Sequence, residues 1–362
     1  MSFLFKKILL FSILININHL RSFDDIQNLR EIIPLVLNKY ETMGLKIHFL
    51  DQIKAKFSAC KSENFSQIFC EKELDFLAHE FCKFMNNSHV VIIWPKALQS
   101  FKYITDEINQ FGKVIYARKI NLKNKALPYL IQNIPEKADN VAFHLEQYFN
   151  NQSSGNVIAV LCTFPDLATA VKCKLTIRQH LNLNPPMSTL HIADTQEQSI
   201  MLAQIVFNQN TINYLNSSLP FSKYEKFNFL FKQYKEIINN LNFDQDLFCV
   251  DGSSILAMHG IRDINVDFDF LSYFPQLDLP PTKYKLDALE LGPMDVHNQA
   301  WINAHVNPIE TIFDPNYYFY YEGFKFTTLE RIRLFKFNQN RELDQKDVKE
   351  IDQLLKEFNY VS

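Results

Sequence analysis

The sequence predicts two domains: an α/β domain built on a parallel β-sheet, followed by an α+β domain. The chain has 362 residues, of which 47% are hydrophobic, and this is enough for two buried cores. Between residues 88 and 216, strand-like and helix-like segments alternate, a pattern typical of a parallel sheet covered by helices on both faces. Residues 216–220, Asn-Ser-Ser-Leu-Pro, have the composition of a linker. We therefore expect the second domain to occupy residues 221–362.

The first 21 residues are expected to form a signal peptide or a membrane anchor. Lys6 and Lys7 precede an apolar run, Ile8 to Ile15, and this order resembles the start of a secretory signal. The run is too short for a transmembrane helix, and no small-residue cleavage site follows it. A cleaved signal, a weak signal anchor and an ordinary buried helix all stay open. The first expectation is a protein of the secretory pathway, and a cytoplasmic protein is the alternative.

Residues 22–87 are expected to be a helical segment, because apolar residues recur there at helical spacing. The apolar positions are Ile26, Leu29, Ile32, Ile33, Val36 and Leu37 in one stretch, and Leu74, Leu77, Phe81 and Phe84 in another. Pro34 interrupts the first stretch, so we expect the helix to kink or divide there.

Residues 88–216 are expected to form the α/β domain. The predicted strands are 89–94, 113–117, 157–162 and 189–192, and the predicted helices are 97–111, 164–180 and 195–207. Asp194 and Thr195 follow the last strand, and ligands of open α/β sheets bind at such strand ends. Capping of the next helix is the alternative explanation for these two residues.

The most informative stretch is 250–271, which reads VDGSSILAMHGIRDINVDFDFL. The turn at Gly252 offers backbone N–H groups, and Ser253 and Ser254 add two hydroxyls, which suits a bound phosphate. A helix that begins near Ile255 would favour an anion at the same place through its unpaired N–H groups. We therefore predict a phosphate-binding turn at these three residues.

Asp267 and Asp269 alternate with apolar residues and are predicted to lie on one face of a strand. Two neighbouring carboxylates repel each other unless a cation lies between them, and such pairs commonly hold Mg²⁺ together with substrate phosphates. We therefore predict that both aspartates are catalytic and bind Mg²⁺ (or Mn²⁺). The alternative is a surface strand with two solvated aspartates.

Together these residues resemble the nucleotidyltransferase fold of the DNA polymerase beta superfamily, and most closely its LicD/fukutin group of phosphotransferases. In that superfamily an apolar residue precedes Gly and then Gly or Ser, and an acid-x-acid strand follows after a short spacer. Here Val250-Asp251-Gly252-Ser253 precedes Asp267-Phe268-Asp269, and Asp251 departs from the simplest motif but matches the LicD/fukutin form. The resemblance covers residues 248–271 well and the rest of the C-terminal third loosely. It implies that 221–362 is a nucleotidyltransferase-like domain and that 88–216 is an accessory domain.

The resemblance also implies a third acid on a neighbouring strand, which acts as a base and as a ligand of a second metal ion. Asp295, in Met294-Asp295-Val296, has the required apolar-acid-apolar form and is our preferred candidate. Asp287, Glu290 and Glu310 compete with it. If none of them fills the role, the domain binds its ligand without catalysing a reaction.

Two basic features complete the candidate site. Arg262 is a candidate for bidentate phosphate binding, and pairing with Asp263 or Asp267 is the alternative. The stretch 341–351 resembles the helix start that closes many nucleotidyltransferase-like domains, in which the residue corresponding to Asp347 caps the helix or bridges basic residues.

The leading functional hypothesis is a metal-dependent nucleotidyltransferase or phosphotransferase that uses a nucleotide or another activated-phosphate donor and modifies a glycan or a small-molecule acceptor. One alternative is a glycosyltransferase, in which Asp267-x-Asp269 holds Mn²⁺ and a sugar nucleotide. A catalytically inactive binding protein of the same fold is the other. The net charge of −3 argues against general binding of nucleic acid. None of the six cysteines forms a Cys-x-x-Cys pair, so local spacing indicates no zinc site.

Overall fold

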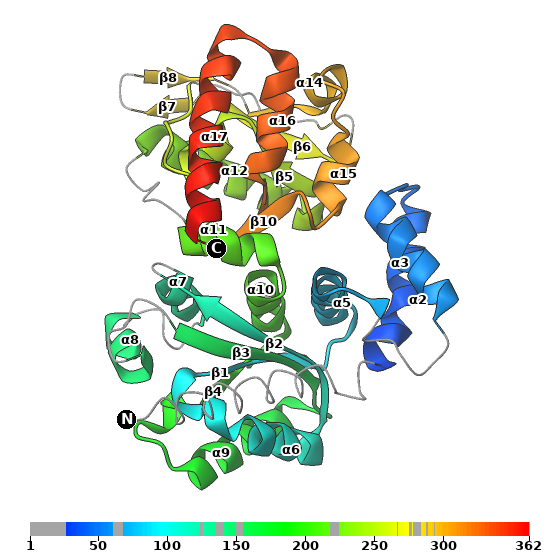
Figure 1. Ribbon diagram of the computed structural model, residues 1–362, viewed down its shortest axis with the longest axis vertical. Helices are drawn as coiled ribbons and strands as arrows, with labels where there is room; N and C mark the ends of the chain where they lie inside the picture. Colours follow the sequence, from blue (N-terminus) through cyan, green and yellow to red (C-terminus); the bar gives the residue numbers. More distant parts are fainter. Residues whose placement is uncertain are drawn as a thin grey trace. The chain divides into compact units, whose positions relative to one another are not determined.

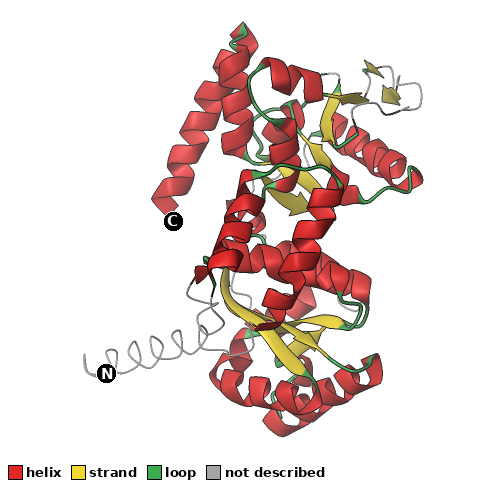
Figure 2. Ribbon diagram, turned by 90° about the vertical axis from the view of Figure 1, so that its right-hand side faces the viewer, coloured by secondary structure: helices red, strands yellow, loops and turns green. Residues whose placement is uncertain are grey.

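The structure is a computed structural model that describes residues 27–60, 68–123, 126–134, 141–149, 155–217, 224–265, 267–274, 277, 284–286, 289–292 and 294–361. The predicted signal or anchor at 1–21 and the linker residues 218–220 lie outside these ranges. Among the described helices, none is long and apolar enough to cross a membrane. The chain is a mixed α/β protein (Figure 2). It divides into two compact units, Met1–Gly44 with Asp51–Asn208, and Leu45–Leu50 with Gln209–Ser362.

The first unit consists of one four-stranded sheet and the helices that accompany it. Its elements are α2 (Gln27–Thr42), α3 (His48–Ala59, in this unit from Asp51), α5 (Glu71–Phe84), β1 (Ser88–Ile93), η2 (Pro95–Ser100), α6 (Phe101–Phe111), β2 (Lys113–Leu122), α7 (Ala126–Gln132), α8 (Val141–Phe149), β3 (Gly155–Thr163), α9 (Leu167–Leu181), η4 (Pro186–Ser188), β4 (Leu190–Ile192) and α10 (Gln196–Val206). Helix α2 continues through Pro34, so the proline does not divide it.

The sheet of the first unit is antiparallel, and the prediction of a parallel sheet is wrong. Its strand order is β2-β3-β1-β4, and all three hydrogen-bonded pairs run in opposite directions. Helix α6 links β1 to β2 and helix α9 links β3 to β4, but neither pair of linked strands is adjacent. In each case one antiparallel strand lies between the two strands that the helix connects, which is the split β-α-β arrangement of ferredoxin-like folds.

The reason for this error is the burial of the strands. All six residues of β1 are buried, so the strand reads as a continuous apolar run. Such a run is typical of a parallel sheet, but any central strand covered on both faces produces it. Helices α6 and α9 pack against each other on one side of the sheet, and α10 covers β1 from the other (Figure 1). The pattern therefore reports burial and carries no information on strand direction.

The second unit contains the motif-bearing residues. Its elements from Gln209 onward are α11 (Gln209–Ser217), α12 (Glu225–Asn240), η6 (Gln245–Leu247), β5 (Phe248–Val250), α13 (Ser253–Met258), β6 (Phe268–Ser272), β7 (Tyr284–Leu286), β8 (Leu289–Leu291), β9 (Met294–Val296), α14 (Asn298–Asn303), α15 (Pro308–Phe313), β10 (Tyr318–Tyr321), β11 (Phe324–Thr327), α16 (Leu329–Gln339) and α17 (Glu342–Val361). Strands β7 and β8 form a separate two-stranded sheet.

The main sheet of the second unit is mixed, with the strand order β10-β11-β5-β6-β9. Strand β6 runs antiparallel to β5 and parallel to β9. In the register of β6 and β9, Asp269 lies opposite Asp295. Residues at the same register position of a parallel pair point to the same face of the sheet, so both carboxylates emerge on one side.

An aromatic layer fixes the other face of this sheet. Tyr234 of α12 packs against Phe268 and Phe270 of β6, with ring centroids 5.2 Å apart in both pairs. Phe231, from the same helix, meets Phe326 of β11 at 5.3 Å. Because side chains alternate along a strand, burial of Phe268 and Phe270 under α12 turns Asp269 to the opposite face.

Gly112 provides a test of the antiparallel pairing of β2 with β3. A Cβ atom at this position would lie 2.0 Å from the carbonyl oxygen of Thr163, at the end of β3. We expect Gly112→Ala to lower the free energy of unfolding by about 1–3 kcal/mol, because the backbone must shift to accept the methyl group. Urea unfolding measures the effect, and Gln110→Ala on the exposed side of α6 should cost less than about 0.5 kcal/mol. An alanine tolerated at 112 would contradict the pairing.

Candidate functional site

Strands β5 and β6 bring Asp251 and Asp269 together. The backbone N–H of Asp251 donates to the carbonyl oxygen of Asp269 over 3.1 Å, which extends the antiparallel pairing past the end of β5. Asp251 is fully buried, and the Asp269 side chain is 12% exposed. Asp267 directly precedes β6 and is half-buried. Asp267 and Asp269 are separated by one residue, so the strand geometry directs both toward the same face.

Gly252 allows the two strands to approach this closely. Its φ of 62° and ψ of −140° fall close to a region that only glycine adopts without strain. A Cβ atom at this position would lie 2.4 Å from the Asp269 Oδ2 atom. The Asp269 carboxylate thus rests against the bare backbone of Gly252, and any side chain there would displace it.

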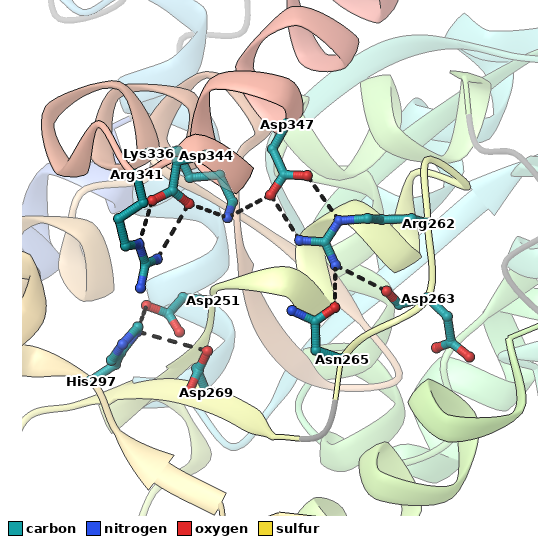
Figure 3. Close-up of polar contacts among 10 residues, drawn as sticks. All are labelled: Asp251, Arg262, Asp263, Asn265, Asp269, His297, Lys336, Arg341, Asp344 and Asp347. Carbon is teal, nitrogen blue, oxygen red and sulfur yellow. Dashed lines mark hydrogen bonds and ion pairs between the residues drawn. The ribbon is translucent and has the colours of Figure 1, made fainter.

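His297 completes a group of three potential metal ligands (Figure 3). It follows β9, where its backbone N–H donates to the carbonyl oxygen of Phe270 over 2.8 Å. Its Nδ1 atom lies 3.4 Å from Asp251 Oδ2 and 3.9 Å from Asp269 Oδ2. One ligand atom from each of the three residues lies within 4.8 Å of the others. Two carboxylates and one imidazole are therefore close enough to share a cation.

The buried carboxylate of Asp251 is only partly satisfied by the protein. Its Oδ2 atom accepts a hydrogen bond from Trp301 Nε1, whereas its Oδ1 atom has no hydrogen-bond partner among the described residues. A buried carboxylate with an unsatisfied oxygen is costly, and buried charges are normally paired or coordinate a metal. The chemistry of the three residues thus fits a cation.

Crowding of negative charge shows in the pKa values of the group. Burial raises the pKa of Asp269 to about 7, repulsion from Asp251, Asp267 and Asp295 adds to the rise, and His297 opposes it. Burial alone would lower the pKa of His297, but the charge of Asp251 and its hydrogen bond, together with Asp269, raise it to about 9. The site thus holds more carboxylates than one imidazolium can neutralise.

The preferred third acid lies beside this group. Asp295 is exposed and directly opposite Asp269 in the strand register. Of its competitors, Asp287 lies outside the described residues, and Glu290 is on β8 of the separate small sheet. Glu310 is on α15, where its carboxylate lies 3.6 Å from Arg331. Asp295 is therefore the candidate that the sheet brings to the metal-ligand group.

The two serines of the predicted phosphate turn are buried. Helix α13 begins at Ser253 and has only six residues, and Gly252 in the preceding position offers no capping side chain. Ser253 is 8% exposed and Ser254 is fully buried. The Ser254 Oγ atom has no hydrogen-bond partner among the described residues. The Gly252 backbone lies next to Asp269, while the Ser254 hydroxyl lies in the interior.

Arg262 is occupied by an acidic partner within the protein (Figure 3). Its Nε and Nη2 atoms each donate to one carboxylate oxygen of Asp347, both over 2.8 Å. Its Nη1 atom donates to the carbonyl oxygen of Asp263 over 3.1 Å. The sequence predicts a phosphate, Asp263 or Asp267 as the partner of Arg262, and of these the structure provides Asp263, through its backbone carbonyl. A phosphate could engage this guanidinium only in competition with Asp347.

Asp347 belongs to a network of charges at the start of α17. Lys336 is buried and lies 3.0 Å from Asp344 and 2.8 Å from Asp347. Burial would raise the pKa of Asp347, but hydrogen bonds from Arg262 and Lys336 outweigh it and lower the pKa. The pKa of Asp344 is also lowered, because its hydrogen bonds to Arg341 and Lys336 outweigh burial.

Arg341 is the exposed cation of this network. Its side chain is 63% exposed and is paired with Asp344. The hydrogen bond to Asp344 is the main cause of its raised pKa, and the charges of Asp269 and Asp267 contribute. Its charge therefore interacts with Asp269 on β6 and with Asp267 just before this strand.

Sequence reasoning missed three residues of the site, which are Asp251 as a ligand, His297 and Trp301. Asp251 could have been included, because it adjoins the Gly252 turn. His297 follows Asp295 by two residues, the spacing of side chains on one face of a strand. Trp301 gave no signal, since its role depends on how α14 packs.

The candidate ligand residues of the first unit have structural partners. The Thr195 side chain caps α10 by accepting from the N–H of Gln198 over 3.1 Å. Asp194 forms an ion pair with Lys174 over 2.7 Å. Capping and pairing thus account for both residues.

No protein-family model matches this chain, and a search of curated proteins finds no significant match.

Gly252→Ala should separate backbone strain from damage to the site. We expect it to cost about 1–3 kcal/mol of stability because of the positive φ. It should also abolish binding of divalent cations, because the methyl group displaces the Asp269 carboxylate. Thermal unfolding and calorimetric titration with Mg²⁺ and Mn²⁺ measure the two effects.

Gly323→Ala is the matched control for this substitution. Gly323 also has a positive φ, of 82°, but a Cβ atom there would meet only Gln245 at an ordinary 3.5 Å. This variant should lose stability and keep cation binding. Equal cation binding by the two variants would disprove the role of Gly252.

Lys336→Met should destabilise the second unit by about 3–5 kcal/mol, because it leaves two buried carboxylates without their shared cation. Lys346→Met, which removes an exposed pair with Glu342, should cost less than about 0.5 kcal/mol.

The effect of Lys336→Met should depend on pH. Because Asp344 and Asp347 have lowered pKa values in the folded protein, the stability that their ionised forms contribute is present above the ordinary pKa of 3.8 and is lost as the pH falls through the lowered values. Urea unfolding of wild type and Lys336→Met should therefore converge in acid, and a gap independent of pH would contradict the assignment.

Proposed function

We propose that the second unit is a metal-dependent nucleotidyltransferase or phosphotransferase. The observation that carries the proposal is the adjacency of β5, β6 and β9, which gathers the Gly252 turn, Asp267 with Asp269, and Asp295 on one side of a mixed sheet. These are the parts that the resemblance to the nucleotidyltransferase fold requires, on three neighbouring strands.

In this proposal Asp267 and Asp269 hold Mg²⁺ (or Mn²⁺), and the ion supplies charge neutralisation to the phosphate oxygens of the donor. The donor is a nucleotide or another activated phosphate. Arg341 is the exposed cation of the neighbouring charge network, and its proposed role is to contact the donor phosphates. The backbone of Gly252 borders the site and leaves room for the Asp269 carboxylate beside it.

Asp295 is the proposed general base. Its carboxylate is exposed and lies opposite Asp269, so it can accept a proton from an acceptor hydroxyl that enters from solvent. The acceptor is a glycan or a small molecule that carries such a hydroxyl. Phosphoryl transfer depends mainly on positioning and charge stabilisation, which this set of residues can provide.

The glycosyltransferase alternative has less support. It requires a nucleotide-binding parallel sheet before the Asp-x-Asp strand in the same domain. In the described part of the second unit, β5 is the only strand that precedes β6. An inactive binding domain stays the second candidate, and it differs from the enzyme in lacking turnover.

Calorimetry with a nucleoside triphosphate in the presence and absence of Mg²⁺ tests the proposal. Wild type should bind the nucleotide only with the metal, and Asp267→Asn with Asp269→Asn should reduce the affinity at least about tenfold by removing metal ligands. Glu236→Gln, which changes an exposed carboxylate of α12, is the control and should bind like wild type. Metal-independent binding of equal strength in all three proteins would refute the metal-dependent mechanism.

A further inference from the structure

We infer that Asp251, Asp269 and His297 form a second cation position on this face, one that takes a first-row transition ion such as Mn²⁺ in preference to Mg²⁺. It shares Asp269 with the proposed transferase site but uses two residues outside the acid-x-acid motif. The inference does not depend on the proposed function, because the cation can be measured without donor or acceptor.

The separation of the three side chains fits a common metal ion. Ligand atoms about 2.1 Å from a metal lie about 3.0–3.5 Å apart when they are neighbours in octahedral or tetrahedral geometry. The Nδ1 atom of His297 lies 3.4 Å from Asp251 Oδ2 and 3.9 Å from Asp269 Oδ2. All three ligand atoms lie within 4.8 Å of one another. The 3.4 Å distance already lies in the range for neighbouring ligands, and side-chain rotation must shorten the 3.9 Å distance for one ion to bind both atoms.

Asp251 gives independent evidence for a ligand at this position. The residue is fully buried, yet its Oδ1 atom accepts no hydrogen bond from the described residues. Removal of one carboxylate oxygen from water without a partner costs several kcal/mol in an apolar setting, and a bound cation would offset this cost. Asp267 and Asp295 are more exposed, so water can solvate their carboxylates without a metal ion.

The donor set determines the preferred ion. Mg²⁺ favours oxygen ligands and usually keeps several waters. Imidazole nitrogen suits Zn²⁺, Fe²⁺, Ni²⁺ and Cu²⁺, and Mn²⁺, although it also favours carboxylates, accepts a nitrogen ligand more readily than the harder Mg²⁺ does. One imidazole with two carboxylates is a mixed set in which the nitrogen adds little to Mg²⁺ affinity. His297 is therefore the residue that sets the preference between the ions.

The surroundings hold the ligands in place before any ion binds. Trp301 donates from its Nε1 atom to Asp251 and stacks on Phe335, with ring centroids 4.9 Å apart. His297 meets the same Phe335 ring edge-on at 5.6 Å. Such outer contacts fix ligand orientation, and their loss typically weakens metal binding.

The competing explanation is that a protonated His297 bridges the two carboxylates and that no metal ion binds there. Titration of the full chain with Mn²⁺ or Mg²⁺ alone separates the two. Wild type should bind Mn²⁺ at least about tenfold more tightly than Mg²⁺, and the pulsed electron paramagnetic resonance signal of bound Mn²⁺ should show coupling to an imidazole nitrogen. This signal requires no variant, so it remains decisive if a substitution unfolds the protein.

Two variants and one control test whether His297 and Asp251 bind the ion. His297→Gln should weaken Mn²⁺ binding about 10–100-fold and change Mg²⁺ binding little, and Asp251→Asn should weaken both. His305→Asn, at an exposed histidine beyond α14 with a positive φ that asparagine tolerates, should match wild type.

Equal affinities for the two ions, absence of nitrogen coupling, or wild-type Mn²⁺ binding by His297→Gln would each overturn the inference. Metal-dependent nucleotide binding that persists in such a case would leave the proposed transferase function standing. Mn²⁺ binding at His297 without nucleotide binding would support the cation position and count against the transferase.

Discussion

The candidate site depends on one steric constraint, the contact of the Asp269 carboxylate with the bare backbone of Gly252. A Cβ atom at 252 would lie 2.4 Å from Asp269 Oδ2, so glycine is required if Asp251 and Asp269 are to meet. The hydrogen bond between their backbones places the two acidic side chains at the same end of the β5–β6 pair. Burial and repulsion from Asp251 then raise the pKa of Asp269 to about 7.

The free-energy cost of holding these carboxylates together is offset by aromatic packing on the other face of the sheet. Phe268 and Phe270 lie under α12 and fix the orientation of β6, so Asp269 cannot turn inward. Strand β9 pairs in parallel with β6 and delivers Asp295 and His297 to the same edge. Hydrophobic packing on one face thus supplies the free energy that positions charged groups on the other.

Charge is distributed unevenly around the site. Lys336 and Arg262 are committed to Asp344 and Asp347, so this part of the network is neutralised internally. The carboxylates of Asp251 and Asp269 have His297 as their closest cationic partner among the described residues, and the more exposed Arg341 interacts electrostatically with Asp269. An excess of negative charge remains on this face. Such an excess favours a divalent cation, and with it a ligand that carries phosphate.

The sequence by itself determined the local features: the alternation that turns Phe268 inward and Asp269 outward follows from the period of a strand, which is a property of neighbouring residues. Tertiary structure decided the rest. The first sheet is antiparallel although its buried strands have the apolar pattern of a parallel one, because burial does not encode direction. Arg262 pairs with Asp347 across 85 positions, and His297 reaches Asp251 only through the pairing of β5, β6 and β9. Contacts of this range depend on strand order, which no local pattern specifies.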